Sequence, residues 1–396
     1  MPVLNFTAKV KELAKVGRVS SGEENGRLAG ARPQGTPRRM AGLPRKPAKA
    51  GDKLAAIDLG TNNCRLLIAE VLPGKQGFRV VDSYARIVRL GEGLLNKGEL
   101  GREPIRRAIE ALSTCAGKIE DWGVTRRWAV TTEACRRARN GRAFIARVKE
   151  ATGLALDIIT PEREVQLAVK GCTSLLDPKY ESALLFDIGG GSTELAWLVR
   201  NGDGRFRLAS WGTLALGVVT LADGFGGREV SAETYEAMVA HVIEALKTLR
   251  PPEALRGLFE TERCHHLGTS GTVTTLAGVH LDLARYDRSK IDGIWLTREA
   301  LSDAGIRLRD MSYEARAAHP CIGRDRADLV IAGYAILDAI QRLWPSEQLR
   351  VADRGLREGM LMSLAKGTGR RRSRRAKPAA DRRPSPLTES AGQPAE

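Results

Sequence analysis

The first part of the chain alternates between short apolar runs and clusters of turn-forming residues. An apolar run at 54–57 ends in Asp58-Leu59-Gly60, and a second run follows at 65–71. Glycine, asparagine and aspartate favour tight turns, so this pattern predicts two strands joined by a short loop. A third strand is expected at 78–90. Apolar positions then recur with the helical period at 103–120, which predicts a helix.

The same order of elements begins again in the second half. The apolar run 182–186 ends in Asp187-Ile188-Gly189 and is followed by strand-like runs at 194–199 and 205–210 and by a long helix expected at 232–249. The two aspartates lie 129 positions apart. Such an internal repeat predicts two similar α/β lobes, each built from a sheet and its covering helices. Ligands commonly bind in the cleft between two lobes.

The remaining periodic segments complete this outline. Further strands are expected at 128–131, 156–159 and 264–267, and further helices at 143–152, from 161 onward, at 271–280, at 298–311 and at 325–343. We therefore expect a first lobe over 51–175 and a second over 176–365, with the last helix free to return to the first lobe. Residues 1–50 and 366–396 have the composition of disordered tails, with few large apolar residues.

Net charge is concentrated in these tails. The chain of 396 residues carries a formal charge of +16. Residues 1–50 account for +8 and residues 366–396 for +6, which leaves +2 for everything between them. The basic composition therefore does not indicate a nucleic-acid-binding body. The arginine-rich C-terminal tail would attract polyanions through its charge, or it would serve only to keep the chain soluble.

Cysteine use and hydropathy predict a cytoplasmic protein. The six cysteines show no C-x-x-C pair and no metal-finger spacing, which is typical of reduced intracellular thiols. No stretch approaches the ~18 uninterrupted apolar residues that a membrane span needs. The N-terminus lacks a compact apolar secretion signal. We therefore expect no contact with a membrane.

Three consecutive glycines make the second Asp-x-Gly loop unusual, because glycine loses more conformational entropy on folding than any other residue. A loop without side chains lets backbone N–H groups close around phosphate oxygens, and neighbouring hydroxyls add donors. The expected phosphate-binding residues here are Gly189, Gly190, Gly191, Ser192 and Thr193. The carboxylates at the two ends, Asp187 and Glu194, are suited to holding a divalent cation. The alternative is an ordinary glycine-rich hairpin.

Two further loops have related chemistry. In the first Asp-x-Gly loop, Asp58 is expected to contact the cation directly or through water, and the expected phosphate-binding residues are Thr61, Asn62, Asn63 and Arg65. The third loop ends a strand and opens a helix, where free backbone N–H groups form an anion site, and its candidates are Ser270, Gly271 and Thr272. Loops of this kind resemble those of the actin-like ATPase superfold, in which duplicated RNase H-like α/β lobes flank an active-site cleft.

The run of motifs also resembles the signature loops of the exopolyphosphatase/guanosine pentaphosphate phosphohydrolase (Ppx/GppA) phosphatase family. Arg326-Ala327-Asp328 and the segment 356–359 are similar as well, so the resemblance covers roughly 54–365. It implies a phosphoanhydride hydrolase that releases the terminal phosphate of inorganic polyphosphate or of guanosine pentaphosphate. It also implies dependence on Mg²⁺ or another divalent cation.

The resemblance places the catalytic glutamate of that family at Glu164, in a helix shortly before the glycine loop, and a phosphate-binding arginine at Arg136. A carboxylate near the terminal phosphate can orient and deprotonate an attacking water. The alternative is that Glu164 only favours the helix dipole from the first turn. Arg163, Gln166 and Asn63 depart from the family pattern, which leaves the substrate preference open.

Alternatives to polyphosphate hydrolysis remain at this stage. Guanosine pentaphosphate would be attacked by the same chemistry. A non-catalytic protein would instead use its tails to bind polyphosphate or RNA, and an actin-like kinase would transfer phosphate from ATP. A homodimer is compatible with the sequence, which does not report an oligomeric state.

Overall fold

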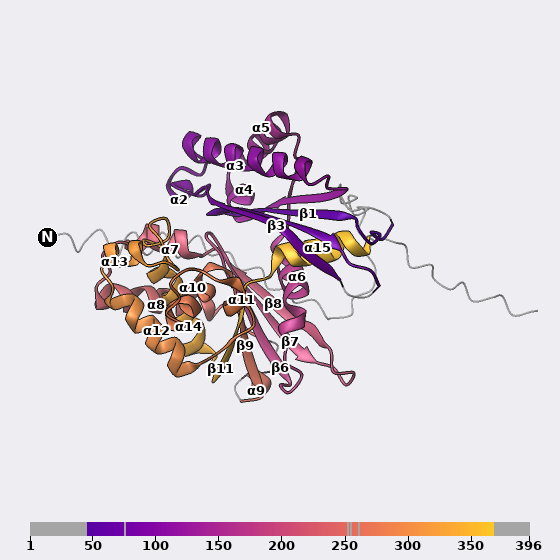
Figure 1. Ribbon diagram of the computed structural model, residues 1–396. Coiled ribbons are helices and arrows are strands. Elements are labelled where there is room, and N and C mark those ends of the chain that lie inside the picture. The colour runs from indigo at the N-terminus through magenta and orange to yellow at the C-terminus, as the bar shows by residue number, and fades with distance from the viewer. Residues whose placement is uncertain (1–45, 75–76, 252, 254–255, 260–261, 368–396) are drawn as a thin grey trace, which may run out of the picture.

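The computed structural model describes residues 46–74, 77–251, 253, 256–259 and 262–367, which form two α/β lobes around a cleft (Figure 1). The tails expected at 1–50 and 366–396 lie almost entirely outside the described residues. Within the described residues, no helix is long and apolar enough to span a bilayer.

The first lobe is built on a five-stranded sheet of order β3-β2-β1-β4-β5. Its strands are β1 (Lys53–Leu59), β2 (Asn63–Val71), β3 (Phe78–Ile87), β4 (Arg126–Thr131) and β5 (Leu156–Ile158). Its helices are α2 (Leu94–Lys97), α3 (Arg102–Asp121), α4 (Glu133–Arg137) and α5 (Gly141–Thr152). Alternate residues of β1 enter cores on opposite faces of the sheet, which explains why the strand is apolar throughout.

The second lobe contains a six-stranded sheet of order β10-β11-β9-β6-β7-β8. Its strands are β6 (Ser182–Ile188), β7 (Thr193–Arg200), β8 (Phe206–Leu214), β9 (Cys264–Thr269), β10 (Trp295–Thr297) and β11 (Gln348–Ala352). Its helices are α7 (Val218–Phe225), α8 (Ala232–Leu246), α9 (Arg256–Phe259), α10 (Ser270–His280), α11 (Arg288–Ile291), α12 (Arg298–Asp310), α13 (Tyr313–Ala318) and α14 (Val330–Leu343). The helices α10, α12 and α14 share one large core with the sheet.

The predicted duplication is confirmed by the strand pairing. β1 pairs antiparallel with β2 and parallel with β4, and β6 pairs in the same way with β7 and β9. The registers are also equivalent, because Asp58 lies opposite Arg65 in one hairpin and Asp187 opposite Glu194 in the other. The two sheets and their pairing confirm the duplicated α/β fold of the actin-like superfold.

Two helices cross between the lobes. α6 (Pro161–Cys172) packs on the second sheet, and α15 (Leu356–Lys366) packs on the first sheet below β1 (Figure 1). Their crossing is closed by glycines, since a Cβ at Gly171 would lie 1.9 Å from the Gly355 carbonyl oxygen and one at Gly359 would lie 2.0 Å from that of Leu167. After β11 the chain therefore leaves the second lobe, and α15 packs on the first.

Several elements differ from the sequence expectation. The helix expected over 325–343 begins only at Val330, and turns precede it. The short elements α7, α13, β10 and β11 were not predicted. β10 has three residues and lies at a sheet edge, where no alternation of apolar and polar positions can be recognised.

Candidate active site

A cavity of about 840 Å³ lies between the lobes, and loops from both lobes line it. The loop after β1, the glycine loop after β6 and the start of α10 after β9 all reach it. Every site residue expected from the sequence lines this cavity except Thr193 and Arg136. The three loops therefore meet, although they lie far apart in the chain.

The glycine loop has free N–H groups, and its carbonyl oxygens are bonded to the start of α7. The N–H groups of Val218 and Val219, at the start of α7, donate to the carbonyl oxygens of Gly189 and Gly190 at 2.9 and 2.8 Å. Within the described residues, the N–H groups of Gly190, Gly191 and Ser192 have no protein acceptor. This arrangement is suited to binding an anion.

The glycines also have a packing role that the sequence did not reveal. A Cβ at Gly190 would lie 3.0 Å from Asn62 Cβ, and one at Gly191 would lie 2.6 Å from Thr61 Oγ1. The first loop therefore occupies the space where side chains would stand. The two Asp-x-Gly loops are in direct contact across the cleft.

Asn62 and Ser270 each have an unusual local environment. The Oδ1 atom of Asn62 is buried and has no hydrogen-bond partner among the described residues, which fits a role in contacting a ligand. Ser270 has a φ of 75°, a left-handed conformation that is costly for a residue with a Cβ. Its hydroxyl donates to Asp187, so Ser270 orients that carboxylate in addition to offering its N–H at the start of α10.

Four of the carboxylates that line the cavity interact electrostatically with one another. Burial raises the pKa of Asp58 to about 6, against the opposing effects of Arg65 and Arg357. Burial also raises the pKa of Glu164 to about 8, and Asp58 and Asp187 raise it further while Arg136 opposes them. The pKa values of Asp187 and Glu194 are raised chiefly by burial, and Glu164 and Asp187 add repulsion at Glu194. Carboxylates that repel one another in this way are suited to binding a cation.

A divalent cation fits this cluster only with ligands from outside the chain. Among the described residues, no group of three or more carboxylate, histidine or cysteine side chains is close enough to hold a metal ion. Mg²⁺ commonly binds through one or two carboxylates and completes its coordination with water and substrate phosphates. Asp58, Asp187 and Glu194 suit that mode, whereas they would not form a closed structural site.

Arg136 lies behind Glu164. Its Nη1 donates to Glu164 Oε2 at 2.8 Å and to the carbonyl oxygen of Ile159 at 2.8 Å, and its Nε donates to Glu133 at 3.1 Å. The expectation that Arg136 contacts phosphate therefore differs from its placement in this structure. It holds the carboxylate of Glu164, which is 9% exposed, toward the cavity.

Thr193 does not have the expected placement either. It is fully buried, and its hydroxyl donates to the carbonyl oxygen of Leu216 at 2.8 Å. Successive side chains of a strand point to opposite faces, so Thr193 turns away from the cavity when Glu194 faces it. Its role is to join β7 to the segment before α7.

Four arginines line the cavity without a carboxylate partner among the described residues. Arg65, Arg326 and Arg357, and the more exposed Arg324, form neither a side-chain hydrogen bond nor an ion pair with any described residue. Burial lowers the pKa values of Arg326 and Arg357, and the nearby Arg65 lowers both further. Cations that repel one another in a cavity are stabilised when an anion binds among them. Of these four, only Arg65 was expected from the sequence as a phosphate ligand.

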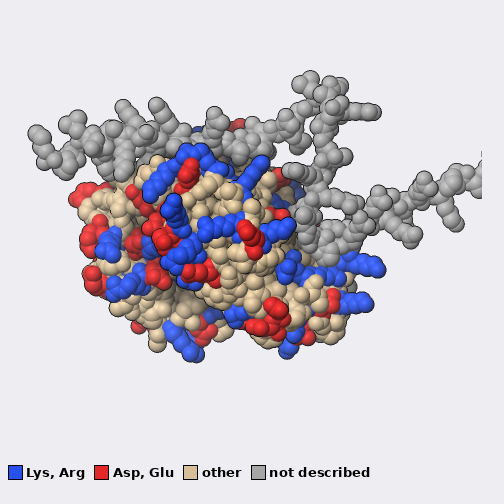
Figure 2. All heavy atoms as spheres, turned by 90° about the horizontal axis from the view of Figure 1, so that it is seen from above, with Lys and Arg blue, Asp and Glu red and all other residues tan. Residues whose placement is uncertain are grey.

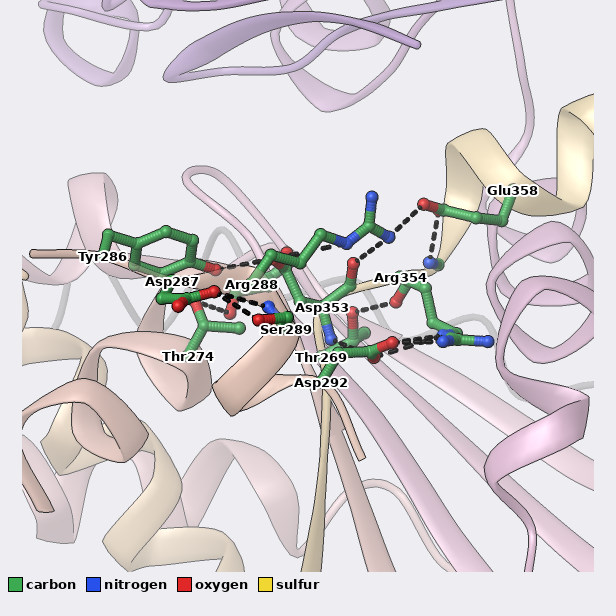
Figure 3. Close-up of polar contacts among 12 residues, drawn as sticks. Thr269, Thr274, Tyr286, Asp287, Arg288, Ser289, Asp292, Asp353, Arg354 and Glu358 are labelled. Carbon is green, nitrogen blue, oxygen red and sulfur yellow. Dashed lines mark hydrogen bonds and ion pairs between the residues drawn. The ribbon is translucent and has the colours of Figure 1, made fainter. Parts of the chain in front are cut away.

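A polar network on the second-lobe side of the cavity was missed by the sequence analysis (Figure 3). The Tyr286 hydroxyl donates to Asp353 Oδ2 at 2.7 Å, and Arg288 Nη2 donates to the Asp353 carbonyl oxygen at 2.6 Å and to Glu358 Oε1 at 2.9 Å. Glu358 Oε2 accepts the N–H of Gly355 at 2.8 Å. The network fixes the segment 353–358, which carries Arg357. No local sequence signal marks Tyr286 or Arg288.

The chain is similar in sequence to proteins named as phosphatases of phosphoanhydrides. The chain is 29% identical over 325 residues to Exopolyphosphatase 2 of Mycobacterium tuberculosis, an alignment that covers 79% of this chain and 98% of that protein. It is 28% identical over 312 residues to the guanosine-5'-triphosphate,3'-diphosphate pyrophosphatase of Photobacterium profundum, which covers 78% of this chain and 59% of that protein.

Solved structures agree with this. The crystal structure of the Aquifex aeolicus member of the Ppx/GppA protein family aligns with a TM-score of 0.64 at 29% identity, over 79% of this chain and 97% of that chain. An exopolyphosphatase structure from Cytophaga hutchinsonii has the same fold, with a TM-score of 0.72 at 23% identity over 80% of this chain and 100% of that chain. The sequence profile of the Ppx/GppA phosphatase family matches residues 67–367. The resemblance seen in the loops is thus confirmed, and the chain belongs to the Ppx/GppA phosphatase family.

Proposed function

We propose that this protein is an exopolyphosphatase-type hydrolase that releases the terminal phosphate of inorganic polyphosphate. One observation carries the proposal. Glu164, a buried carboxylate held by Arg136, faces a cavity that also presents unpaired backbone N–H groups and four arginines without carboxylate partners among the described residues. Such a cavity suits a phosphate chain whose charge is not localised on one group, and its carboxylate suits hydrolysis.

Substrate binding is assigned to the loops and arginines. The oxygens of the terminal phosphates would accept hydrogen bonds from the N–H groups of Gly190, Gly191 and Ser192 and from those at the start of α10. Arg65, Arg326 and Arg357 would neutralise the charge of the chain, and bidentate contacts from guanidinium groups would fix its position. Selectivity for phosphate then depends on these few groups, because acidic and basic side chains are interspersed on the face of the body seen in Figure 2.

Hydrolysis is assigned to Glu164. Its carboxylate would accept a proton from a water molecule as the water oxygen bonds to the terminal phosphorus. The phosphoanhydride bond then breaks, and the shortened chain leaves with the bridging oxygen. Arg136 would hold Glu164 in place through its Nη1 contact at 2.8 Å. Phosphoryl transfer of this kind depends mainly on positioning and on stabilising charge.

Mg²⁺ or another divalent cation is proposed as the cofactor, held directly by one or two of Asp58, Asp187 and Glu194 and otherwise through water and substrate oxygens. Such an ion, when bound, stabilises negative charge on the phosphate oxygens during bond cleavage. The raised pKa values of these three carboxylates support this assignment, since a cation would relieve their repulsion.

Guanosine pentaphosphate is the second candidate substrate. The similarity to the pyrophosphatase of Photobacterium profundum favours it, although the chain spans 59% of the length of that protein. The reaction would be the same, with a nucleotide in place of the remaining chain. The cytoplasm is the proposed location, because all six cysteines are free and buried, as expected of a reducing compartment.

A phosphate-release screen tests the proposal. Purified full-length protein is given polyphosphate, guanosine pentaphosphate or ATP, each with and without Mg²⁺, and inorganic phosphate is measured. The proposal requires release from polyphosphate that depends on Mg²⁺ and exceeds release from the other two substrates. Faster release from guanosine pentaphosphate would support the second candidate. No release from any substrate would contradict both and leave a polyanion-binding protein, whose tails could be tested by deleting 1–50 and 366–396.

A further inference from the structure

A bidentate ion pair joins the lobes through side chains outside the catalytic residues. Arg89 follows β3 of the first lobe, and its Nη1 and Nη2 donate to Asp328 Oδ2 and Oδ1 at 2.9 and 3.0 Å. Nη2 also donates to the carbonyl oxygen of Asp325 at 3.1 Å. Asp328 lies just before α14 of the second lobe, so the contact spans the cleft. We call the pair of Arg89 and Asp328 the clasp.

The clasp lies away from the helices that connect the lobes. Asp328 packs against the segment after α7, because a Cβ at Gly227 would lie 1.9 Å from its carbonyl oxygen. In Figure 1, α7 and α2, which follows Arg89 closely, lie on the opposite side of the molecule from α15. The lobes are thus linked at one end by the crossing of α6 and α15 and at the other by the clasp. A contact far from such a crossing restrains opening most effectively.

Arg89 is tied to the first phosphate loop by its backbone. Its N–H donates to the Asn62 carbonyl oxygen at 3.0 Å, and the neighbouring N–H of Val88 donates to the same oxygen at 2.8 Å. Arg89 has a φ of 47°, which is unfavourable for a residue with a Cβ. The surroundings therefore hold it in this conformation, with its side chain directed at the other lobe.

Asp328 is tied to Arg326, one of the arginines that line the cavity without a carboxylate partner among the described residues. The segment between Gly323 and Val330 is held by its own turns: the Arg326 N–H donates to the Gly323 carbonyl oxygen at 3.1 Å, and the Arg326 carbonyl oxygen accepts from Leu329 at 2.8 Å. The Arg326 side chain has no hydrogen-bond or ion-pair partner among the described residues. Its position relative to the first loop therefore depends on the contact at Asp328.

The acidic residues around the clasp are partly neutralised by Arg89. Burial raises the pKa of Asp223 in the second lobe, and Glu92 of the first lobe and Asp328 of the second raise it further, while Arg89 opposes them. Arg107 pairs with Glu92 at 2.5 Å within the first lobe. Without Arg89, acids of the two lobes would face one another across the cleft. Removing it would therefore replace an attraction between the lobes with a repulsion.

From this geometry we propose that Arg89 is a positioning residue. Through Asp328 it holds the two lobes together and sets the distance between the first phosphate loop and Arg326. The inference concerns the same cavity as the proposed hydrolase and rests on that function for its kinetic test. Arg89 does not itself contact substrate.

The kinetic test is a mutant cycle on polyphosphate hydrolysis. Arg89→Ala and Asp328→Ala should each raise KM about tenfold with a smaller change in kcat, the scale of one partly buried charge-assisted pair. The double variant should be no worse than either single variant. In an Arg326→Ala background, Arg89→Ala should have little further effect. An equal loss in that background would show that Arg89 does not act through Arg326 and would overturn the proposal.

Hydrogen exchange of the full-length protein tests the clasp without catalysis. In Arg89→Ala, amides of 61–63 and 323–329 should exchange several times faster, because the lobes open more often. In Arg89→Lys, exchange should be faster than in the wild-type protein and slower than in Arg89→Ala, because lysine keeps the charge but cannot make the bidentate contact. Lysine has the same unfavourable φ at this position as arginine. The matched control is Arg342→Ala, which breaks contacts to Asp338 and Glu236 within the second lobe. Unchanged exchange in Arg89→Ala would refute the clasp, whereas lack of phosphate release by the wild-type protein would refute only the proposed function.

Discussion

Replacing Glu164 with glutamine should abolish catalysis while preserving the site around it. Glutamine has nearly the same shape, and its side-chain oxygen can still accept the Nη1 hydrogen bond of Arg136. What is lost is the carboxylate that we propose takes a proton from water. The variant therefore separates proton transfer from folding and substrate binding.

The magnitude follows from general-base catalysis. Such a base typically contributes about 10²–10⁴-fold to the rate, or roughly 3–5 kcal/mol of transition-state stabilisation. Stability should not fall with the substitution. Burial and the neighbouring Asp58 and Asp187 disfavour the charge of Glu164, and the neutral amide avoids that cost.

The pH dependence gives a second measure of the same residue. The pKa of Glu164 is raised to about 8, so the carboxylate needed for proton transfer is the minor form below that pH. In the wild-type protein, kcat/KM should therefore rise from pH 6 to pH 9 with a midpoint near the pKa of the free enzyme. Increasing Mg²⁺ should move this midpoint to lower pH, because a cation nearby favours the ionised form.

The assay measures phosphate release from polyphosphate at several pH values, together with substrate binding by calorimetry. Glu164→Gln should bind polyphosphate within a few-fold of wild type but release phosphate at least 100-fold more slowly, at the low end of the expected range. Glu162→Gln is the matched control, since Glu162 is exposed in the same helical turn. Activity of Glu164→Gln within tenfold of wild type, or an equal loss in Glu162→Gln, would refute the assignment.

Three further substitutions test the surroundings of the site. Asp58→Asn should abolish Mg²⁺-dependent phosphate release. It should also stabilise the metal-free protein at pH 8 by about 2–3 kcal/mol, because the pKa of Asp58 is raised to about 6 and its ionised carboxylate destabilises the fold above that pH. Denaturant unfolding at pH 5 and pH 8 checks the sign of this effect. Thr193→Val should leave KM unchanged and lower stability by about 1–2 kcal/mol, because the hydrogen bond to the Leu216 carbonyl oxygen is lost. A large rise in KM would instead show that Thr193 binds phosphate. Gly171→Ala should lower the melting temperature, because the added Cβ would lie 1.9 Å from the Gly355 carbonyl oxygen. Moving α6 and α15 apart to make room for it should cost about 1–3 kcal/mol of stability. An unchanged melting temperature would contradict the tight packing of these two helices.

Local patterns were sufficient to predict the repeated part of the fold. β1 and β6 are apolar on both faces and end in the same turn motif, so their pairing with the next strands could be inferred from neighbouring residues alone. The long helices also repeat their apolar positions at the helical period. The start of α14 was misplaced because the preceding residues, up to Leu329, satisfy their hydrogen bonds in turns.

Side-chain direction in the site was less predictable. Thr193 and Glu194 are adjacent and both polar, yet the cavity is lined by only one of them. The choice depends on which face of β7 meets α7 and which meets the cleft. Arg136 likewise carries the expected charge, but its contacts with Glu164 and with the Ile159 carbonyl oxygen turn it behind the carboxylate.

The sequence by itself was sufficient to predict two α/β lobes, three candidate phosphate-binding loops, and a glutamate on the helix before the glycine loop. These features depend on residues close together in the chain, whose backbone preferences and apolar periods are local. Only the tertiary structure decided which charges converge on the cavity and which are neutralised elsewhere. Arg65, Arg326 and Arg357 come from separate segments, and whether each has a carboxylate partner is settled by packing between the lobes. The clasp of Arg89 and Asp328 joins residues 239 positions apart, a contact that no local pattern can specify.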